Sequence, residues 1–182
     1  MPAIDGKRVA FLATDGVEQV ELDRPWQAVT DAGGQPELVS LDSGDIQAFN
    51  HLDKADKKHV DRAIDDADAD SYDALVLPGG VANGDFIRAD ERAARFVRGF
   101  ADAGKPISVI CHGGWVLIEA DAVRGKTMTS WPSLRTDLRN AGATWVDEEV
   151  VVDNGLVSSR KPDDLDAFCA KVIEEISEGV HV

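Results

Sequence analysis

Two turns in this 182-residue chain hold the residue types that covalent catalysis uses. The first contains Cys111, which follows the apolar run 107–110 and precedes His112, Gly113 and Gly114. A nucleophile between a strand and a helix needs small neighbours, because the backbone there is strained and the side chain must stay exposed. The spacing therefore predicts that Cys111 sits on a nucleophile elbow.

The second turn is the Pro-Gly-Gly sequence at residues 78–80, which follows the apolar run 74–77. Parallel strands bring their carboxyl ends to one edge of a sheet, so we expect both turns to border one cleft. Free N–H groups at a helix N-terminus favour a thiolate, which predicts a depressed pKa for the Cys111 thiol. The amides of Gly80 and His112 are the predicted donors to an oxyanion.

A free cysteine can also be a small core residue. Cys169 fits that description, because it shares one face of the last predicted helix with Leu165, Phe168 and Val172. Cys111 lies between a strand and glycines instead. That position favours a reactive role, either as a nucleophile or as a redox centre.

The rest of the chain alternates apolar strands with helices. Strands are predicted at 8–13, 37–41, 74–77 and 107–110, and the charged stretch 43–70 is predicted as a small hairpin and short helix. Continuous runs of Val, Ile and Leu predict a mostly parallel sheet covered by helices on both faces. We find no linker and no repeat, so we expect one α/β domain over residues 1–182.

Charge and composition exclude several classes of partner. The net charge of −15 repels phosphate backbones and anionic lipids, which disfavours nucleic acid and membrane surfaces. No apolar run approaches the roughly 18 residues of a membrane span, and no secretory signal is recognisable. We therefore expect a cytoplasmic protein. The two cysteines show neither a disulfide framework nor metal-ligand spacing.

The remaining histidines and tryptophans receive structural assignments. We predict that His51, His59 and His181 face solvent, because two lie in the charged stretch and one in the tail. The tryptophans assigned to packing are Trp26, Trp115 and Trp145.

The chain resembles the PfpI family of the DJ-1/PfpI superfamily. The resemblance rests on a glutamate after the first strand, on LPGG at 77–80, on ICHGGW at 110–115 and on VVVDNGLVSSRKPDDL at 150–165. It covers almost the whole chain. It implies a three-layer, flavodoxin-like α/β/α sandwich, a cysteine nucleophile followed by histidine, no cofactor, and a homodimer or homohexamer.

Carried over by this resemblance, Cys111 is the nucleophile, His112 its adjacent base and Glu18 the carboxyl group beside the sulfur. Gly80 matches the family's oxyanion glycine. Asp85 is the nearest match to the acidic partner that reaches the histidine from a neighbouring subunit, although the turn is one residue longer here.

Two further residues bear on the carried-over site. Trp131 matches an aromatic residue on the cleft rim, and a buried tryptophan anchoring the turn is the alternative. A carboxylate beside a thiolate is repulsive unless it is protonated, so we expect a raised pKa for Glu18. The alternative for Glu18 is an exposed position at a helix start.

The resemblance implies an enzyme that acts on small reactive carbonyls or glycated proteins, as a glyoxalase or a deglycase, with a peptidase as a further alternative. A class I glutamine amidotransferase would need a downstream His-x-Glu pair, and the only later histidine, His181, is followed by valine at the end of the sequence. A non-enzymatic stress protein that senses oxidation through Cys111 is the competing hypothesis.

Overall fold

The computed structural model describes residues 2–182 and places most strands in one sheet. The sheet has the order β10-β11-β7-β6-β1-β2-β5, and every neighbouring pair is parallel except β10 with β11. Its strands are β1 (Arg8–Leu12), β2 (Gln35–Ser40), β5 (Arg62–Ala63), β6 (Ala74–Leu77), β7 (Ile107–Ile110), β10 (Val151–Asp153) and β11 (Leu156–Ser159).

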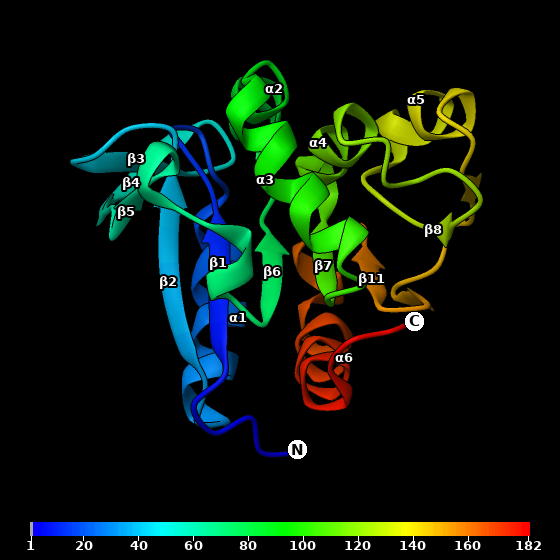
Figure 1. Ribbon diagram of the computed structural model, residues 1–182. Coiled ribbons are helices and arrows are strands. Elements are labelled where there is room, and N and C mark those ends of the chain that lie inside the picture. Colours follow the sequence, from blue (N-terminus) through cyan, green and yellow to red (C-terminus); the bar gives the residue numbers. More distant parts are fainter. Residues whose placement is uncertain (1) are drawn as a thin grey trace.

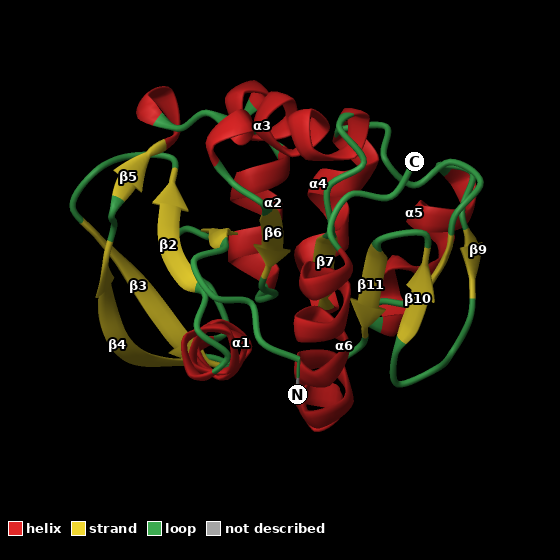
Figure 2. Ribbon diagram, turned by 60° about the horizontal axis from the view of Figure 1, so that its bottom comes forward, coloured by secondary structure: helices red, strands yellow, loops and turns green. Residues whose placement is uncertain are grey.

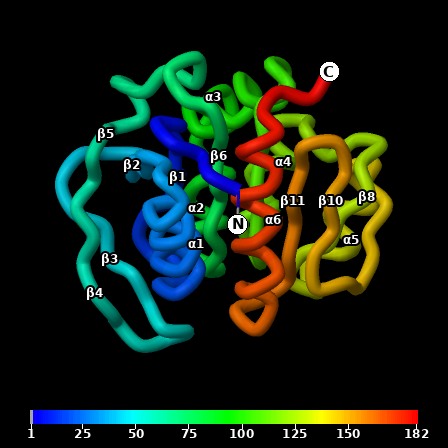
Figure 3. The backbone as a smooth tube through the Cα atoms, turned by 90° about the horizontal axis from the view of Figure 1, so that it is seen from below, coloured from blue at the N-terminus to red at the C-terminus, as the bar shows by residue number. Residues whose placement is uncertain are grey.

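Helices cover both faces of this sheet. Figure 2 shows α1 and α6 on one side and α2, α3 and α4 on the other, and Figure 3 shows α1 and α6 side by side. The helices are α1 (Gln19–Asp31), α2 (Val81–Arg88), α3 (Glu91–Asp102), α4 (Gly114–Glu119), α5 (Arg135–Asn140) and α6 (Leu165–Glu178). The predicted three-layer α/β/α sandwich is confirmed.

The strand β6 shows why the central strands are apolar throughout. Ala74 and Val76 pack into the core under α1 and α6, whereas Leu75 and Leu77 pack into the core on the opposite face. Side chains alternate between the two faces of a strand, so a strand that is buried on both sides must be apolar at every position. In β7 the same alternation places Ile107 and Val109 in one core and Ile110 in the other, and Ser108 is a buried polar residue of this strand.

Two small sheets lie outside the central one (Figure 1). The hairpin of β3 (Asp45–Asn50) and β4 (Asp53–His59) occupies the predicted charged stretch, and β8 (Thr127–Met128) pairs with β9 (Thr144–Trp145). The hairpin is tied to the main domain, because the Phe49 amide donates to the Val17 carbonyl at 2.9 Å. This contact brings the hairpin over the start of α1.

Two separate helices, α2 and α3, follow β6. Asp90 ends the first helix and caps the second, since its side chain accepts a hydrogen bond from the Arg92 amide. An aspartate in extended conformation before a helix satisfies an otherwise free N–H group, and this favours two helices over one.

No helix among residues 2–182 is both long enough and apolar enough to cross a bilayer.

Candidate active site

Cys111 occupies the predicted elbow between β7 and α4. Its φ is +61°, in the left-handed region that side chains other than glycine rarely adopt. A short 3₁₀ turn (Cys111–Gly113) follows and leads directly into α4. Strain of this kind persists only where the surroundings enforce it, and it is concentrated at functional sites.

Glycines around Cys111 allow the neighbouring chain segments to pack closely against the elbow, and this packing holds its conformation. A Cβ atom on Gly79 would lie 2.6 Å from the Cβ of Cys111, and one on Gly113 would lie 2.6 Å from the carbonyl oxygen of Leu77. Gly80 has φ +97°, and a Cβ there would lie 2.2 Å from the carbonyl oxygen of Gly16. The two predicted turns therefore meet at one place because Gly79 and Gly113 have no side chain at the points of contact.

The amides of Gly80 and His112 point at the sulfur of Cys111 and lower its pKa. They do not dominate, however. Burial and the neighbouring Glu21 carboxyl raise the pKa of the thiol well above its usual range. The expectation of a depressed pKa is thus wrong for the isolated chain, because a desolvated site with an acidic neighbour outweighs two amide dipoles.

Glu21, in the first turn of α1, is the carboxyl group that interacts with the Cys111 thiol. Its side chain is fully buried, and its Oε2 accepts a hydrogen bond from the Gly79 amide at 2.9 Å. Burial, with the nearby Glu18, raises its pKa to about 8. At neutral pH most of the Glu21 carboxyl is therefore protonated, and it can share its proton with the sulfur.

Glu18 was the wrong glutamate for this position. Its carboxylate accepts hydrogen bonds from the His51 amide at 3.1 and 3.3 Å, at the tip of the β3–β4 hairpin. Glu18 precedes the first helical residue and bridges to Phe49, so its backbone follows the hairpin. Glu21 lies one helical turn further, where its side chain faces the sheet edge. The property expected for Glu18, a raised pKa beside the thiol, belongs to Glu21.

His112 lies between the sulfur and two aromatic rings. Its Nδ1 is 3.2 Å from the Cys111 sulfur, and burial lowers its pKa, so the ring is neutral at pH 7. Trp131 stacks on the imidazole with ring centroids 5.7 Å apart, and Trp115 meets it edge-on at 5.2 Å. These rings restrict the orientation of the imidazole. A neutral imidazole next to a thiol can accept its proton.

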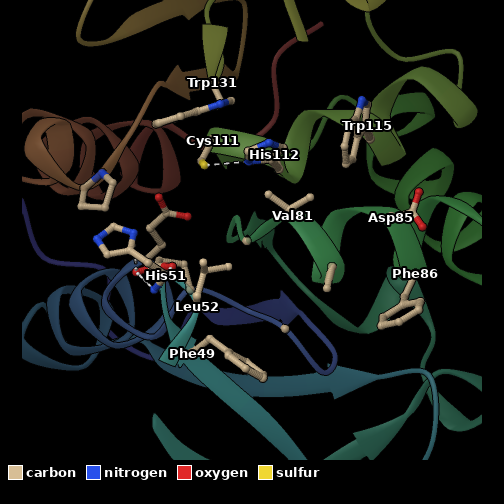
Figure 4. A pocket seen from close by; sticks show the side chains of 16 residues that line it. Phe49, His51, Leu52, Val81, Asp85, Phe86, Cys111, His112, Trp115 and Trp131 are labelled. Carbon is tan, nitrogen blue, oxygen red and sulfur yellow. Dashed lines mark hydrogen bonds and ion pairs between the residues drawn. The ribbon is translucent and has the colours of Figure 1, made fainter. Parts of the chain in front are cut away.

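The reactive groups open into a pocket of about 600 Å³ (Figure 4). Trp131 stands on its rim with 38% of its surface exposed, in agreement with the rim assignment. Trp115 also lines the pocket, although it was assigned to packing alone. Trp26 and Trp145 do pack against the core, as predicted.

Asp85 also lines this pocket, from the exposed side of α2. Figure 4 shows its carboxylate on the far side of Trp115 from Cys111. No hydrogen bond or ion pair joins Asp85 to His112 within residues 2–182. The expected contact across a subunit boundary involves a second chain and stays a prediction.

The side chain of His51 faces solvent, as predicted, whereas that of His181 is largely covered. His51 lines the pocket and holds Glu18 through its backbone amide, although its side chain is exposed. His181 packs on Gly155, and its Nε2 lies 3.1 Å from a carboxylate oxygen of Glu175. His59 is exposed in the hairpin and lies near Asp45, as expected for a solvent-facing residue.

Comparison with known proteins agrees with this geometry. The DJ-1/PfpI family matches residues 7–175. The chain belongs to the DJ-1/PfpI family. Among its relatives is a Bacillus subtilis protein, YraA, named as a candidate cysteine protease, which is 43% identical over 89% of this chain and 94% of its own length. Deglycase TK1284 of Thermococcus kodakarensis is 38% identical over 92% of this chain and 98% of its own length.

Solved structures of DJ-1/PfpI proteins share the fold. A two-domain protein of Anabaena variabilis, with DJ-1/ThiJ/PfpI-like and ferritin-like domains, superposes with a TM-score of 0.88 and 32% identity. The match covers 94% of this chain and 48% of that protein. DJ-1beta of Drosophila melanogaster gives a TM-score of 0.83 at 24% identity, over 95% of each chain.

Proposed function

We propose that this DJ-1/PfpI protein is a cofactor-independent cysteine enzyme that acts on reactive α-ketoaldehydes or on the adducts they form with proteins. The observation that carries the proposal is the contact of the Cys111 thiol with both the Glu21 carboxyl and the His112 imidazole. A nucleophile (Cys111), a base (His112) and a proton donor (Glu21) are then close enough to act on one carbonyl group. The deglycase names of several relatives support the same class of reaction.

The proposed reaction of methylglyoxal begins at the thiol. Because the pKa of Cys111 is raised, the resting group is a thiol, and His112 Nδ1 takes its proton as the sulfur attacks the aldehyde carbon. An S–C bond forms, and the aldehyde oxygen receives a proton to give a hemithioacetal. The amides of Gly80 and His112 stabilise the negative charge on that oxygen as it develops.

Proton transfer then converts the hemithioacetal into product. Glu21 is protonated at rest, donates its proton to the oxygen, and as a carboxylate removes the C–H proton from the former aldehyde carbon. Return of that proton to the neighbouring carbonyl carbon, with transfer of the hydroxyl proton from the oxygen of the first carbon to that of the second, gives a lactate thioester. Water adds to the thioester carbon and gives a proton to the Glu21 carboxylate, the S–C bond breaks, and the sulfur regains the proton held by His112 as lactate is released. The net change adds one water to methylglyoxal and needs no external oxidant.

We also propose that the protein works as a homodimer or homohexamer in which Asp85 of one copy approaches His112 of another. Nδ1 of His112 faces the sulfur, so only Nε2 is left for an acidic partner. Asp85 is exposed and is available to a second copy. Light scattering that gives the mass of one chain would contradict this part of the proposal.

The experiment that tests the function offers the purified protein two substrates in parallel, methylglyoxal and denatured casein. We expect lactate to form from methylglyoxal and little peptide to be released from casein. Release of peptide without lactate would favour a peptidase. If neither substrate changes, but peroxide converts Cys111 to its sulfinic acid with high selectivity, the redox-sensor hypothesis replaces the enzyme.

A further inference from the structure

The pocket around Cys111 has an unusual charge pattern. Three carboxyl side chains line it, those of Glu18, Glu21 and Asp85, and no lysine or arginine within residues 2–182 does. An anionic substrate would therefore meet the carboxylates of Glu18 and Asp85 without a lysine or arginine to pair with it. Both deglycation and α-ketoaldehyde conversion are possible with neutral and with anionic substrates. The charge of the pocket lining can therefore select neutral substrates over anionic ones.

Three basic side chains that lie close to lining residues in the sequence, or contact one, have acidic partners. Arg88 pairs with Glu119 at 2.7 Å and covers the ring of Trp115, and Arg160 pairs with Asp164 at 2.9 Å. Lys161, next to the lining residue Pro162, lies 3.7 Å from Asp163. Recognition of carboxylate or phosphate depends on such cations. None of these three side chains lines the pocket.

The mouth of the pocket is apolar. Leu52, Val81, Phe86 and Trp131 all line it and are 95%, 58%, 52% and 38% exposed. Figure 4 shows Leu52 and Val81 on one side of the Cys111–His112 pair and Trp131 on the other. Large apolar side chains gathered around a concave site mark a surface that a ligand covers.

The size of the pocket also favours a substrate larger than methylglyoxal. Pockets of roughly 300–1,000 Å³ bind ligands of drug size, and the volume here is about 600 Å³. A three-carbon ketoaldehyde would leave the apolar walls in contact with water. A larger apolar substituent would bury them and gain binding energy in proportion to the area.

We infer that the preferred substrates are uncharged α-ketoaldehydes with an aryl or branched alkyl substituent, and that the pocket rejects carboxylated or phosphorylated analogues. This inference deepens the proposed function and rests on it for turnover. Its charge component also has a test that needs no turnover, namely the alkylation of Cys111.

The turnover test compares phenylglyoxal, 4-carboxyphenylglyoxal and methylglyoxal. The two aryl compounds carry the same reacting group and differ by one carboxylate. We expect kcat/KM for phenylglyoxal to exceed that for the carboxylated compound and that for methylglyoxal, each by about tenfold or more. Equal values for the two aryl compounds would overturn the inference while leaving the proposed function intact.

The alkylation test compares iodoacetamide with iodoacetate in a Cys169→Ala background. The sulfur of Cys111 forms a bond to carbon and iodide leaves in both cases, so only the charge of the reagent differs. Relative to the same ratio for N-acetylcysteine, we expect the amide to be favoured by about tenfold or more. An unchanged ratio would overturn the inference.

A charge-matched pair of variants assigns the effect to the pocket. Glu18→Gln combined with Asp85→Asn removes two charges from the lining, and Asp31→Asn combined with Asp102→Asn removes two exposed charges outside it. The first pair should lower the reagent ratio toward that of N-acetylcysteine, and the second should leave it unchanged. If the first pair leaves the reagent ratio unchanged, the pocket carboxylates do not discriminate against anionic reagents, and the inference is overturned. Normal reagent selectivity without ketoaldehyde turnover would contradict the proposed function alone.

Discussion

The carboxyl group of Glu21 lies against the thiol of Cys111, and the Gly79 amide holds it there. The two acids share one buried site without a paired cation. Burial and the Glu21 carboxyl raise the pKa of the Cys111 thiol, whereas burial and Glu18 raise the pKa of Glu21 against a lowering by its hydrogen bond with Cys111. A negative charge on the sulfur is therefore stabilised best when Glu21 is protonated. In the proposed mechanism this relationship makes Glu21 the group that carries the proton.

Glutamine substitutions at Glu21 and Glu18 should have unequal effects. Glu21→Gln keeps an acceptor for the Gly79 amide but cannot transfer a proton, so we expect kcat on methylglyoxal to fall by about 10²–10⁴. Glu18→Gln keeps an acceptor for the His51 amide and should change kcat by less than about threefold. Steady-state kinetics on both variants checks this. The reverse order of effects would restore the sequence-based assignment of Glu18.

The stability of the protein should depend on pH through Glu21. Its carboxyl ionises near pH 4.5 in the unfolded chain and near pH 8 in the folded one, so the folded state holds the proton more tightly. The resulting stability is complete below pH 4.5 and is lost as the pH rises to about 8. Urea unfolding between pH 5 and 9 should show Glu21→Gln gaining on the wild type, by on the order of a few kcal/mol. Parallel curves would contradict the buried, protonated carboxyl.

His112 should matter through its proton affinity and not only through packing. His112→Ala removes the base that lies 3.2 Å from the sulfur, and we expect turnover to fall by about 10²–10⁴. His112→Gln keeps a polar side chain of similar length and should be equally inactive. Recovery of activity in the glutamine variant would reduce His112 to a positioning role.

Alanine at Gly113 and at Gly114 should shift stability in opposite directions. Both have helical φ values, −59° and −64°. A Cβ on Gly114 meets only Leu134 Cδ2 at 3.6 Å, so Gly114→Ala should stabilise the protein by about 0.4–1 kcal/mol. Gly113→Ala would place a Cβ 2.6 Å from the Leu77 carbonyl oxygen and should cost about 1–3 kcal/mol. Thermal unfolding of the two variants measures the difference.

Local sequence was sufficient for the elbow and for the order of the main elements. The buried-strand sequence Ile-Ser-Val-Ile followed by Cys-His-Gly-Gly identifies β7 and the turn at Cys111, because both features depend on neighbouring residues. The assignment of Trp131 to the rim came from the family resemblance and agrees with the structure.

The choice between the two glutamates depended on tertiary structure. Glu18 and Glu21 are one helical turn apart, and only the packing of the β3–β4 hairpin draws Glu18 away to the His51 amide. A usable signal was nevertheless present, since Glu21 shares the buried face of α1 with Leu22, Pro25 and Val29. An acid among buried positions of a helix is a functional candidate.

The pKa of Cys111 could not be read from the sequence for a related reason. The helix N-terminus is visible in the pattern, but the burial of the sulfur and its acidic neighbour come from residues distant in the chain. The contact of His181 with Glu175 was equally hidden from the sequence, because it is made by the return of the chain after α6.

The most direct test of the account compares the two cysteines of the chain. Both are buried, but Cys111 lies on the strained elbow and Cys169 packs in the core against α1. Lactate formation from methylglyoxal should continue in Cys169→Ala at close to the wild-type rate and fall to the background rate in Cys111→Ala, with both variants folded by circular dichroism. Lactate formation by Cys111→Ala at the wild-type rate would contradict the assignment of Cys111 as the nucleophile.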